Sequence, residues 1–118
     1  RDARAITVLV AEDEATGRIV GTVMGVDHAR AYNDPENGSS LWCLGVSPQA
    51  SYPGIGEAMV RRLAEHFKGR GSATLDLSVL HDNKEAIALY EKLGFRKMKT
   101  GMARFIKRDF MQAVGFTE

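Results

Sequence analysis

The segment that decides the fold reads Asn83-Lys-Glu-Ala-Ile-Ala-Leu-Tyr-Glu-Lys-Leu-Gly-Phe95. Apolar side chains recur in it at helical spacing and form one stripe: Ala86, Leu89, Tyr90 and Leu93. Asp82 and Glu85 stand at the spacing of a capping box, so we expect the helix to begin at 82–83, and Gly94 is expected to end it. The pattern predicts a helix with one face on a core.

A strand and a second helix are predicted upstream of this segment. Residues 73–80 alternate, with Leu75, Leu77 and Val79 on one side and Thr74, Asp76 and Ser78 on the other. From Gly54, apolar residues recur every fourth position, the stripe of a core-facing helix that Gly69 and Gly71 end: Ile55, Met59, Leu63 and Phe67. We expect the polar side of the strand to face solvent, and His66, on the polar side of the helix, to be solvated.

Further strands are predicted on both sides of these elements. Two β-branched runs separated by turn-forming residues are typical of an antiparallel hairpin, and a third strand follows a loop at 28–39. The expected strands are 6–11, 19–26, 41–46 and, after the two helices, 95–101 and 102–108, whereas 109–118 gives no signal. The predicted order is β-β-β-α-β-α-β-β, a chain of the α/β (α+β) class.

The composition indicates one domain with little net charge. At 118 residues and 44% hydrophobic, the chain has room for a single core, so we expect one domain over residues 1–118. The formal charge of +1 gives no general attraction to nucleic acid or to an anionic membrane, so we expect neither as a partner. Because the first residue is Arg1 rather than Met, we expect the chain to belong to a longer protein.

Cysteine and histidine usage points to a cytoplasmic protein without a metal. A single cysteine, Cys43, cannot form an internal disulfide, and no apolar run approaches the roughly 20 residues that a membrane helix needs. The three histidines, His28, His66 and His81, are scattered and show no metal-ligand spacing with it.

A glycine-containing loop joins the third strand to the first helix. It reads Val46-Ser-Pro-Gln-Ala-Ser-Tyr-Pro-Gly-Ile-Gly56. Free backbone N–H groups at a helix start bind phosphate, and glycines let the ligand approach them, so a pyrophosphate is the candidate ligand. The alternative is that the glycines only permit a tight turn. The loop lacks the Gly-Lys-Ser/Thr of a P-loop and the third glycine of a dinucleotide fingerprint.

Together the two quoted segments resemble the signatures of the GNAT acyltransferases, V-x-P-x-x-[RQ]-x-x-G-x-G and N-x-x-A-x-x-L-Y-E-K-x-G-F. The resemblance covers about residues 6–107 and departs at Ser51, where the family has Arg or Gln. It implies an N-acetyltransferase that uses acetyl-CoA, with a mixed, mainly antiparallel sheet and flanking helices. The family's first strand and two helices, which form the acceptor wall, have no counterpart before Ile6.

The resemblance also implies the site residues. The residues expected at the cofactor are Leu44, Gly45, Val46, Ser51, Tyr52, Pro53, Gly54, Ile55, Gly56, Asn83 and Tyr90. In the family, pantetheine lies between two strands that splay apart, and Gly45 is a plausible bulge that starts the splay. The backbone N–H near Leu44 would stabilise the oxyanion, and Tyr90 would protonate the leaving thiolate. Taken alone, Tyr90 is also consistent with core packing, and Asn83 with a helix cap.

The general base is not identified by the sequence. Many family members carry a glutamate about where Cys43 stands, and a lone strand cysteine is usually a small buried residue rather than a nucleophile. Asp76 and Ser78 could instead hold a water that takes the proton, although both are inert if their side of the strand faces solvent.

The acceptor is expected to be a small-molecule primary amine. Five short stretches also resemble GNAT modules associated with ATP-grasp ligases in the synthesis of N-acetylglutaminylglutamine: Trp42-Cys-Leu44, Pro48-Gln-Ala50, Gly56-Glu-Ala58, Ala64-Glu-His-Phe67 and Leu75-Asp-Leu-Ser-Val79. This resemblance would make the acceptor an amino-acid or dipeptide α-amine and implies a covalent or neighbouring ligase domain as a partner. A homodimer is a separate expectation. The alternatives are a non-catalytic acyl-CoA-binding module of a larger protein and a purely structural domain.

Overall fold

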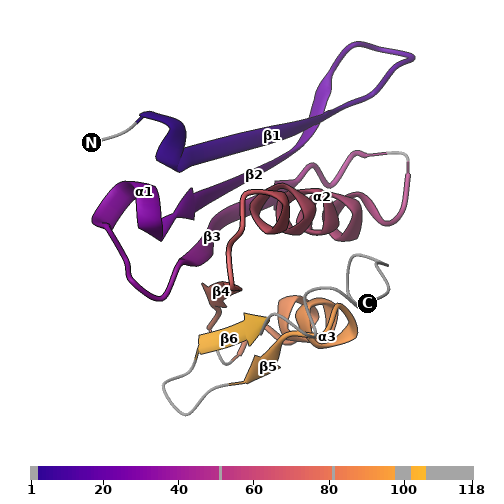
Figure 1. Ribbon diagram of the computed structural model, residues 1–118. Coiled ribbons are helices and arrows are strands. Elements are labelled where there is room, and N and C mark those ends of the chain that lie inside the picture. Colours follow the sequence, from indigo (N-terminus) through magenta and orange to yellow (C-terminus); the bar gives the residue numbers. More distant parts are fainter. Residues whose placement is uncertain (1–2, 51, 81, 98–101, 106–118) are drawn as a thin grey trace.

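The chain folds around one mixed sheet, seen in a computed structural model that describes residues 3–50, 52–80, 82–97 and 102–105. After a 3-10 turn at Ala3–Ala5, the elements are β1 Ile6–Glu12, β2 Ile19–Asp27, α1 His28–Tyr32, β3 Gly38–Val46, α2 Ile55–Gly69, β4 Thr74–Ser78, α3 Lys84–Lys92, β5 Arg96–Lys97 and β6 Met102–Phe105. The strands are ordered β1-β2-β3-β4-β6-β5 (Figure 1). Among the described strands, only the β3–β4 pairing is parallel, so the mixed, mainly antiparallel sheet is confirmed.

A short helix replaces part of the predicted loop at 28–39. Asp27 caps α1 by accepting a hydrogen bond from the Ala29 N–H at 3.1 Å, and Asn33 ends the helix in the left-handed region with φ 54°. The following strand begins at Gly38, three residues before the predicted start at Leu41. The loop prediction was wrong because five residues are too few for a periodic pattern.

Helix α3 begins one residue later than the predicted capping box. Asn83 is its N-cap, and the Asn83 side chain accepts a hydrogen bond from the Ala86 N–H at 3.2 Å. The Asp82–Glu85 prediction is therefore wrong, although the helix it marked is present. The predicted end is confirmed, because Gly94 has φ 98° just after the helix. Parts of the predicted closing strands, at 98–101 and 106–108, and the tail at 109–118 lie outside the described residues.

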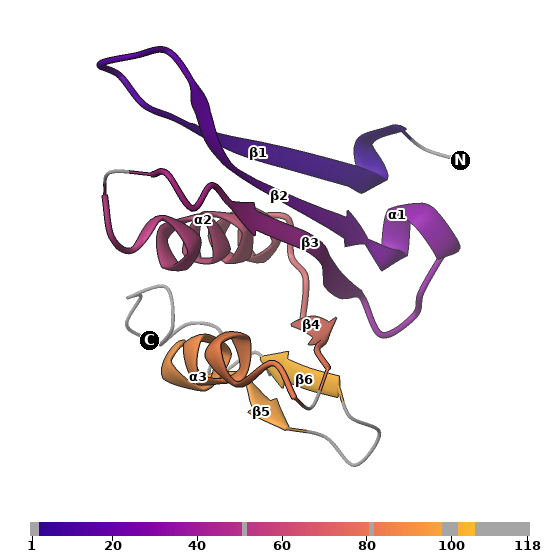
Figure 2. The same cartoon turned by 180° about the vertical axis from the view of Figure 1, so that it is seen from behind.

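The core lies between the sheet and α2, whose apolar stripe was predicted. The buried members of this stripe are Met59, Val60, Leu63, Ala64 and Phe67. Two glycines of β2 allow the helix to approach the strand closely. A Cβ at Gly21 would lie 2.7 Å from the Met59 sulfur, and one at Gly25 would lie 2.6 Å from the Phe67 ring. Figures 1 and 2 show α2 on the β2–β3 part of the sheet and α3 beside the β5–β6 part.

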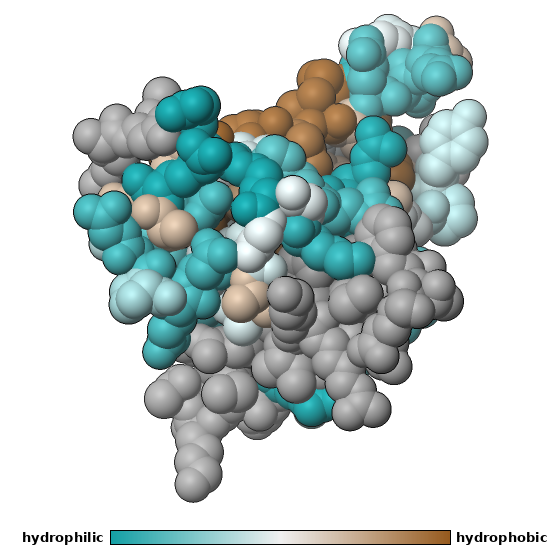
Figure 3. Space-filling view, in the orientation of Figure 1, coloured by the Kyte–Doolittle hydropathy of each residue, from teal (hydrophilic) through white to brown (hydrophobic). Residues whose placement is uncertain are grey.

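The outer strand β1 has two unlike faces. Ile6, Val8 and Val10 are exposed on the face away from α2, while Leu9 and Ala11 pack against the core. Figure 3 shows apolar atoms gathered along the upper margin of the molecule, where β1 runs. The edge strand therefore carries apolar rather than charged side chains outward. Among the described residues, no helix has the length and apolar character that crossing a membrane requires.

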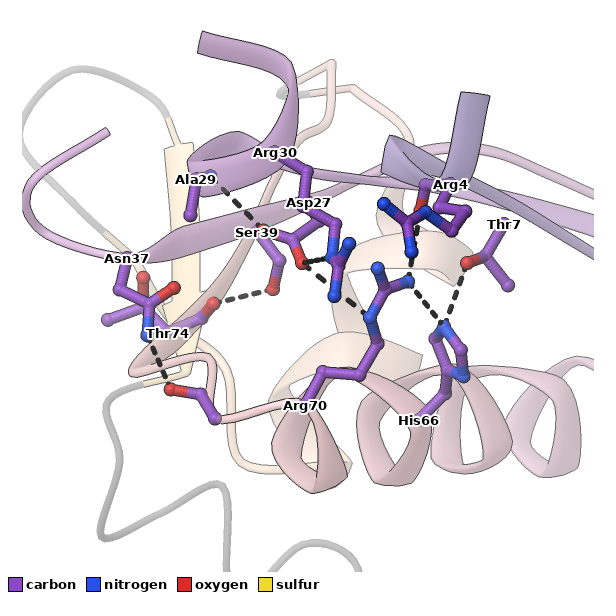
Figure 4. Close-up of polar contacts among 11 residues, drawn as sticks. Arg4, Thr7, Asp27, Ala29, Arg30, Asn37, Ser39, His66, Arg70 and Thr74 are labelled. Atoms are coloured by element: carbon purple, nitrogen blue, oxygen red, sulfur yellow. Dashed lines mark hydrogen bonds and ion pairs between the residues drawn. The ribbon is translucent and has the colours of Figure 1, made fainter. Parts of the chain in front are cut away.

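A polar cluster joins the end of β2 to the end of α2 (Figure 4). Arg70 lies 3.8 Å from the buried carboxylate of Asp27 and donates a hydrogen bond to the Arg4 carbonyl at 3.0 Å. His66 Nε2 lies 3.3 Å from the Arg70 guanidinium and 2.8 Å from the Thr7 hydroxyl. His66 is thus partly buried and hydrogen-bonded, so the prediction that it is solvated was wrong.

This cluster predicts a loss of stability in mild acid. A guanidinium can only donate, so His66 Nε2 accepts and the ring is neutral. Burial, with the Arg70 charge next, lowers the pKa of His66 below its usual 6.5. As the pH falls through about 6.5, the His66 ring is therefore protonated in the unfolded chain before it is protonated in the folded protein. The contribution of neutral His66 to the free energy of unfolding is lost below that pH. We expect the melting temperature to fall between pH 7.5 and 5.5, and to fall less in His66→Gln. An equal fall in both proteins would contradict the role of His66.

Candidate active site

Strands β3 and β4 part after a short parallel pairing. Gly38 pairs with Thr74, Ser39 with Leu75 and Ser40 with Asp76, and the register ends there. Beyond this point the two strands border a pocket of about 170 Å³. Its lining residues are Ser40, Leu41 and Trp42 from β3 and Asp76, Leu77 and Ser78 from β4. An opening between two parallel strands can receive an extended ligand.

The irregularity in β3 lies at Trp42 rather than at Gly45. Met24 of β2 pairs with Cys43 and Gly25 with Leu41, so Trp42 is the extra residue of a bulge. Gly45 pairs regularly with Thr22, so the predicted bulge at Gly45 was wrong. The Trp42 bulge lies two residues beyond Ser40, the last β3 residue that pairs with β4, and it therefore marks where β3 leaves β4.

The glycine loop ends at the free N-terminus of α2. Gly54 is the N-cap, with φ 79°, and no side chain of the described residues caps this helix. The first backbone bond of the helix runs from the Ala58 N–H to the Gly54 carbonyl, so the preceding N–H groups at 55–57 have no partner within the helix. A Cβ at Gly54 would meet no atom within 4 Å. The space that phosphate oxygens would need is open.

The start of α2 lies beside β3 and α3. A Cβ on Gly56 would lie 3.6 Å from Val46 and 3.8 Å from Leu89, which places the loop, the strand end and the last helix together. Lys92 of α3 forms an ion pair with Glu57 of α2 at 2.9 Å. The hydrogen bond from Lys92 lowers the pKa of Glu57 and offsets its charge near the helix start.

Tyr90 combines a core position with a hydroxyl that no described residue engages. Its side chain is 7% exposed and makes an edge contact with Phe95, with ring centroids 5.4 Å apart. Burial raises the pKa of Tyr90 above its usual 10.0, so the phenol is protonated at neutral pH. No hydrogen bond joins the hydroxyl to another residue of the described part of the chain. Packing and proton donation are therefore compatible in this residue.

The other predicted cofactor residues lie on β3, on the loop before α2 and at the start of α3. Leu44 is partly buried against the core, and Tyr52 and Pro53 are exposed on the loop before α2. Asn83 is exposed, and because its side-chain oxygen caps α3, only its amide N–H₂ is left for a ligand. Ser51 lies outside the described residues, as does His81.

Two residues near the opening differ from expectation. Asp76 is only 4% exposed, and its carboxylate accepts a hydrogen bond from the Ser40 hydroxyl, so the polar side of β4 does not simply face solvent. Ser78 at the strand end is exposed, as expected. Cys43 is exposed, which contradicts the prediction of a small buried residue. Within the described ranges, no three His, Cys, Asp or Glu side chains are grouped so that they could hold a metal ion.

Known proteins share this fold and sequence pattern. The model of the acetyltransferase (GNAT) family matches residues 1–95. A ribosomal-protein-alanine N-acetyltransferase from Brucella melitensis is 25% identical with a TM-score of 0.70, over 87% of this chain and 70% of that one. The ribosomal-protein-S18-alanine N-acetyltransferase from Escherichia coli is 22% identical with a TM-score of 0.71, over 89% and 71%. PaiA N-acetyltransferase from Thermoplasma acidophilum, solved with coenzyme A, is 18% identical with a TM-score of 0.70, over 86% and 61%.

The match over residues 1–95 covers most of the chain and includes the glycine loop and the whole Tyr90 segment. This chain therefore belongs to the GNAT family of acetyltransferases. It is an acyltransferase that uses acetyl-CoA, with amines as the class of acceptor.

Proposed function

We propose that this chain transfers the acetyl group of acetyl-CoA to the primary α-amine of an amino acid or short peptide. The amine attacks the thioester directly while both substrates are bound. The observation that carries the proposal is the opening between β3 and β4, where a pocket with the carboxylate of Asp76 lies beyond the last paired residues. Two of the similar structures are named as N-acetyltransferases of an alanine, which supports an α-amine.

The residues around the opening have separate roles in this proposal. The free N–H groups at the start of α2 bind the pyrophosphate, and Gly54 leaves space for it. Pantetheine lies between β3 and β4, with Gly45, Val46 and Asn83 beside it. The backbone N–H near Leu44 stabilises the oxyanion, and Tyr90 protonates the thiolate of coenzyme A.

A dipeptide is the first acceptor to examine. The resemblance to GNAT modules beside ATP-grasp ligases supports glutaminylglutamine, made in the cytoplasm by a neighbouring ligase domain or protein. An α-amine has a pKa near 8, so a useful fraction is neutral at mildly basic pH.

Size-exclusion chromatography of the full-length protein distinguishes a monomer from a homodimer.

Release of coenzyme A in the presence of different amines tests the proposal. We expect turnover with glutaminylglutamine and other dipeptides whose α-amine is free, and none with the same dipeptides blocked at the α-amine. Turnover only with polyamines or with lysine side chains would contradict the α-amine acceptor. Binding of acetyl-CoA without turnover of any amine would instead identify a non-catalytic acyl-CoA-binding module.

Direct attack predicts that Cys43 is dispensable. Although the Cys43 thiol is exposed on β3, it carries no acetyl group in a ternary-complex reaction. We expect kcat of Cys43→Ala and Cys43→Ser to stay within about twofold of the wild type, since surface substitutions have small effects. Loss of turnover in both variants, with folding and acetyl-CoA affinity intact, would show a covalent acetyl-cysteine.

A further inference from the structure

A chain of polar groups leads from the pocket to the surface at α1. Ser40 and Asp76 are directly opposite in the β3–β4 register, and the Ser40 hydroxyl is hydrogen-bonded to the Asp76 carboxylate. On its other side, the Ser40 oxygen lies 2.7 Å from Nε2 of His28. Three side chains from β4, β3 and α1 are thus joined in one continuous line.

The line ends at a fixed carboxylate. His28 Nδ1 lies 3.6 Å from Asp34, at an ion-pair distance. Asp34 also accepts backbone hydrogen bonds from Gly38 and Glu36, each at 3.0 Å, and these lower its pKa. A positive charge on the His28 ring would therefore face an anion that the loop holds in place.

The side chains become more exposed from the pocket to the surface, as a proton path to solvent requires. Asp76 and Ser40 are buried, whereas the His28 and Asp34 side chains are 24% and 22% exposed. Gly38 leaves room for His28 beside the strand, because a Cβ at Gly38 would lie 3.1 Å from His28 Nδ1. The inner end borders the pocket and the outer end contacts water.

We propose that Asp76, Ser40 and His28 form a proton relay that takes the surplus proton from the acceptor amine to solvent. The proposal rests on the acetyl transfer proposed above and supplies the general base that the sequence does not show. Asp76 is the catalytic base because it borders the pocket, while Ser40 and His28 act through it.

The proton movements balance with the acyl transfer. As the N–C bond forms and the C–S bond breaks, the thiolate takes a proton from Tyr90, and the amine nitrogen gives one to Asp76. Before the transfer the Ser40 hydroxyl donates to the Asp76 carboxylate; once Asp76 is protonated, the hydroxyl turns toward His28, which is in its Nδ1–H tautomer and has a free lone pair on Nε2. Asp76 then passes its proton to the Ser40 oxygen while Ser40 passes its own to His28 Nε2. The imidazolium then releases its Nδ1 proton to water beside Asp34, and Tyr90 regains a proton from solvent.

Kinetics of matched variants test the relay with the amine that the wild-type chain turns over best. General acid–base catalysis is worth 10²–10⁴-fold, so Asp76→Asn should lower kcat by about 100-fold, with acetyl-CoA affinity within about twofold of the wild type. Ser40→Ala should lower kcat by roughly 10-fold and Ser40→Thr should restore it. Added imidazole should raise the kcat of His28→Ala.

Ser39→Ala is the control for lost hydroxyl groups on this strand. Ser39 is also buried, beside Ser40, but its hydroxyl donates to the Thr74 carbonyl at 2.6 Å and takes no part in the relay. We expect thermal unfolding to respond similarly in Ser39→Ala and Ser40→Ala, and kcat to fall only in Ser40→Ala. An equal fall in both would show that the hydroxyl matters for structure alone.

NMR spectroscopy tests the hydrogen-bonded connection between Asp76 and His28 without a measurement of turnover. In protein labelled with ¹⁵N-histidine, Asp76→Asn should shift the Nε2 resonance of His28, and this shift should vanish when Ser40 is already alanine. No shift in either background would overturn the relay. If the wild-type chain acetylates an amine and the Asp76, Ser40 and His28 variants match it, the relay fails and the proposed function stands. If the wild type acetylates no amine, both fail.

Discussion

Replacing Tyr90 by phenylalanine is expected to lower kcat by about 100-fold while acetyl-CoA affinity changes by less than about twofold. The phenylalanine ring keeps the buried packing and the edge contact with Phe95, so only the hydroxyl is lost. Because burial raises the pKa of Tyr90, the hydroxyl is protonated throughout the neutral range and can donate to the forming thiolate. For the same reason, its ionisation should not reduce activity below about pH 10.

Two measurements separate this role from packing. Steady-state release of coenzyme A gives kcat, and calorimetry gives the affinity for acetyl-CoA. Tyr32→Phe serves as the control, since Tyr32 is 54% exposed on α1 and outside the opening. An equal decrease in affinity and in kcat for Tyr90→Phe would remove Tyr90 as the acid and leave it a core residue.

Gly54→Val is expected to weaken acetyl-CoA binding by more than about 100-fold. The valine side chain would occupy the open space at the start of α2, and φ 79° is unfavourable for a β-branched residue. Hydrogen bonds to a charged group are worth about 1.5–3 kcal/mol each, so losing two from the phosphates accounts for this loss of affinity.

Gly71→Val is the matched control for backbone strain. Gly71 has φ 90° and likewise no atom within 4 Å of an added Cβ, but it follows the other end of α2. The left-handed conformation costs each valine roughly 1–2 kcal/mol. Both variants should therefore lose similar stability, and only Gly54→Val should lose binding. Retained affinity in Gly54→Val would show that the loop does not bind the phosphates.

The larger elements could be predicted because their patterns are local. Helix α2 repeats its apolar stripe over 15 residues, and β1 and β2 are β-branched runs with turn-forming residues between them. Helix α1 could not be predicted, because its five residues depend on the Asp27 cap and the left-handed Asn33. Residue spacing does not reveal such a cap, because Asp27 is also the last residue of the preceding strand.

In the candidate site, too, the residues in local motifs could be predicted and those joined by the fold could not. The glycine loop and Tyr90 were found because each lies in a continuous motif, although the cofactor roles drawn from them stay predictions. The link from Asp76 through Ser40 to His28 was missed because it depends on the β3–β4 register, which joins residues 36 positions apart. Alternation along β4 suggested that Asp76 faces solvent, but Leu75, Asp76 and Leu77 are buried in succession, so both faces of β4 are covered there.

Calorimetric titration of the chain with acetyl-CoA, coenzyme A and ATP tests the central claim most directly. If the opening between β3 and β4 and the start of α2 form the cofactor site, acetyl-CoA and coenzyme A both bind with one site per chain, whereas ATP, which lacks pantetheine, does not. If acetyl-CoA fails to bind, or if ATP binds as tightly, the opening is not an acyl-CoA site, and the roles given to Gly54 and Tyr90 are wrong.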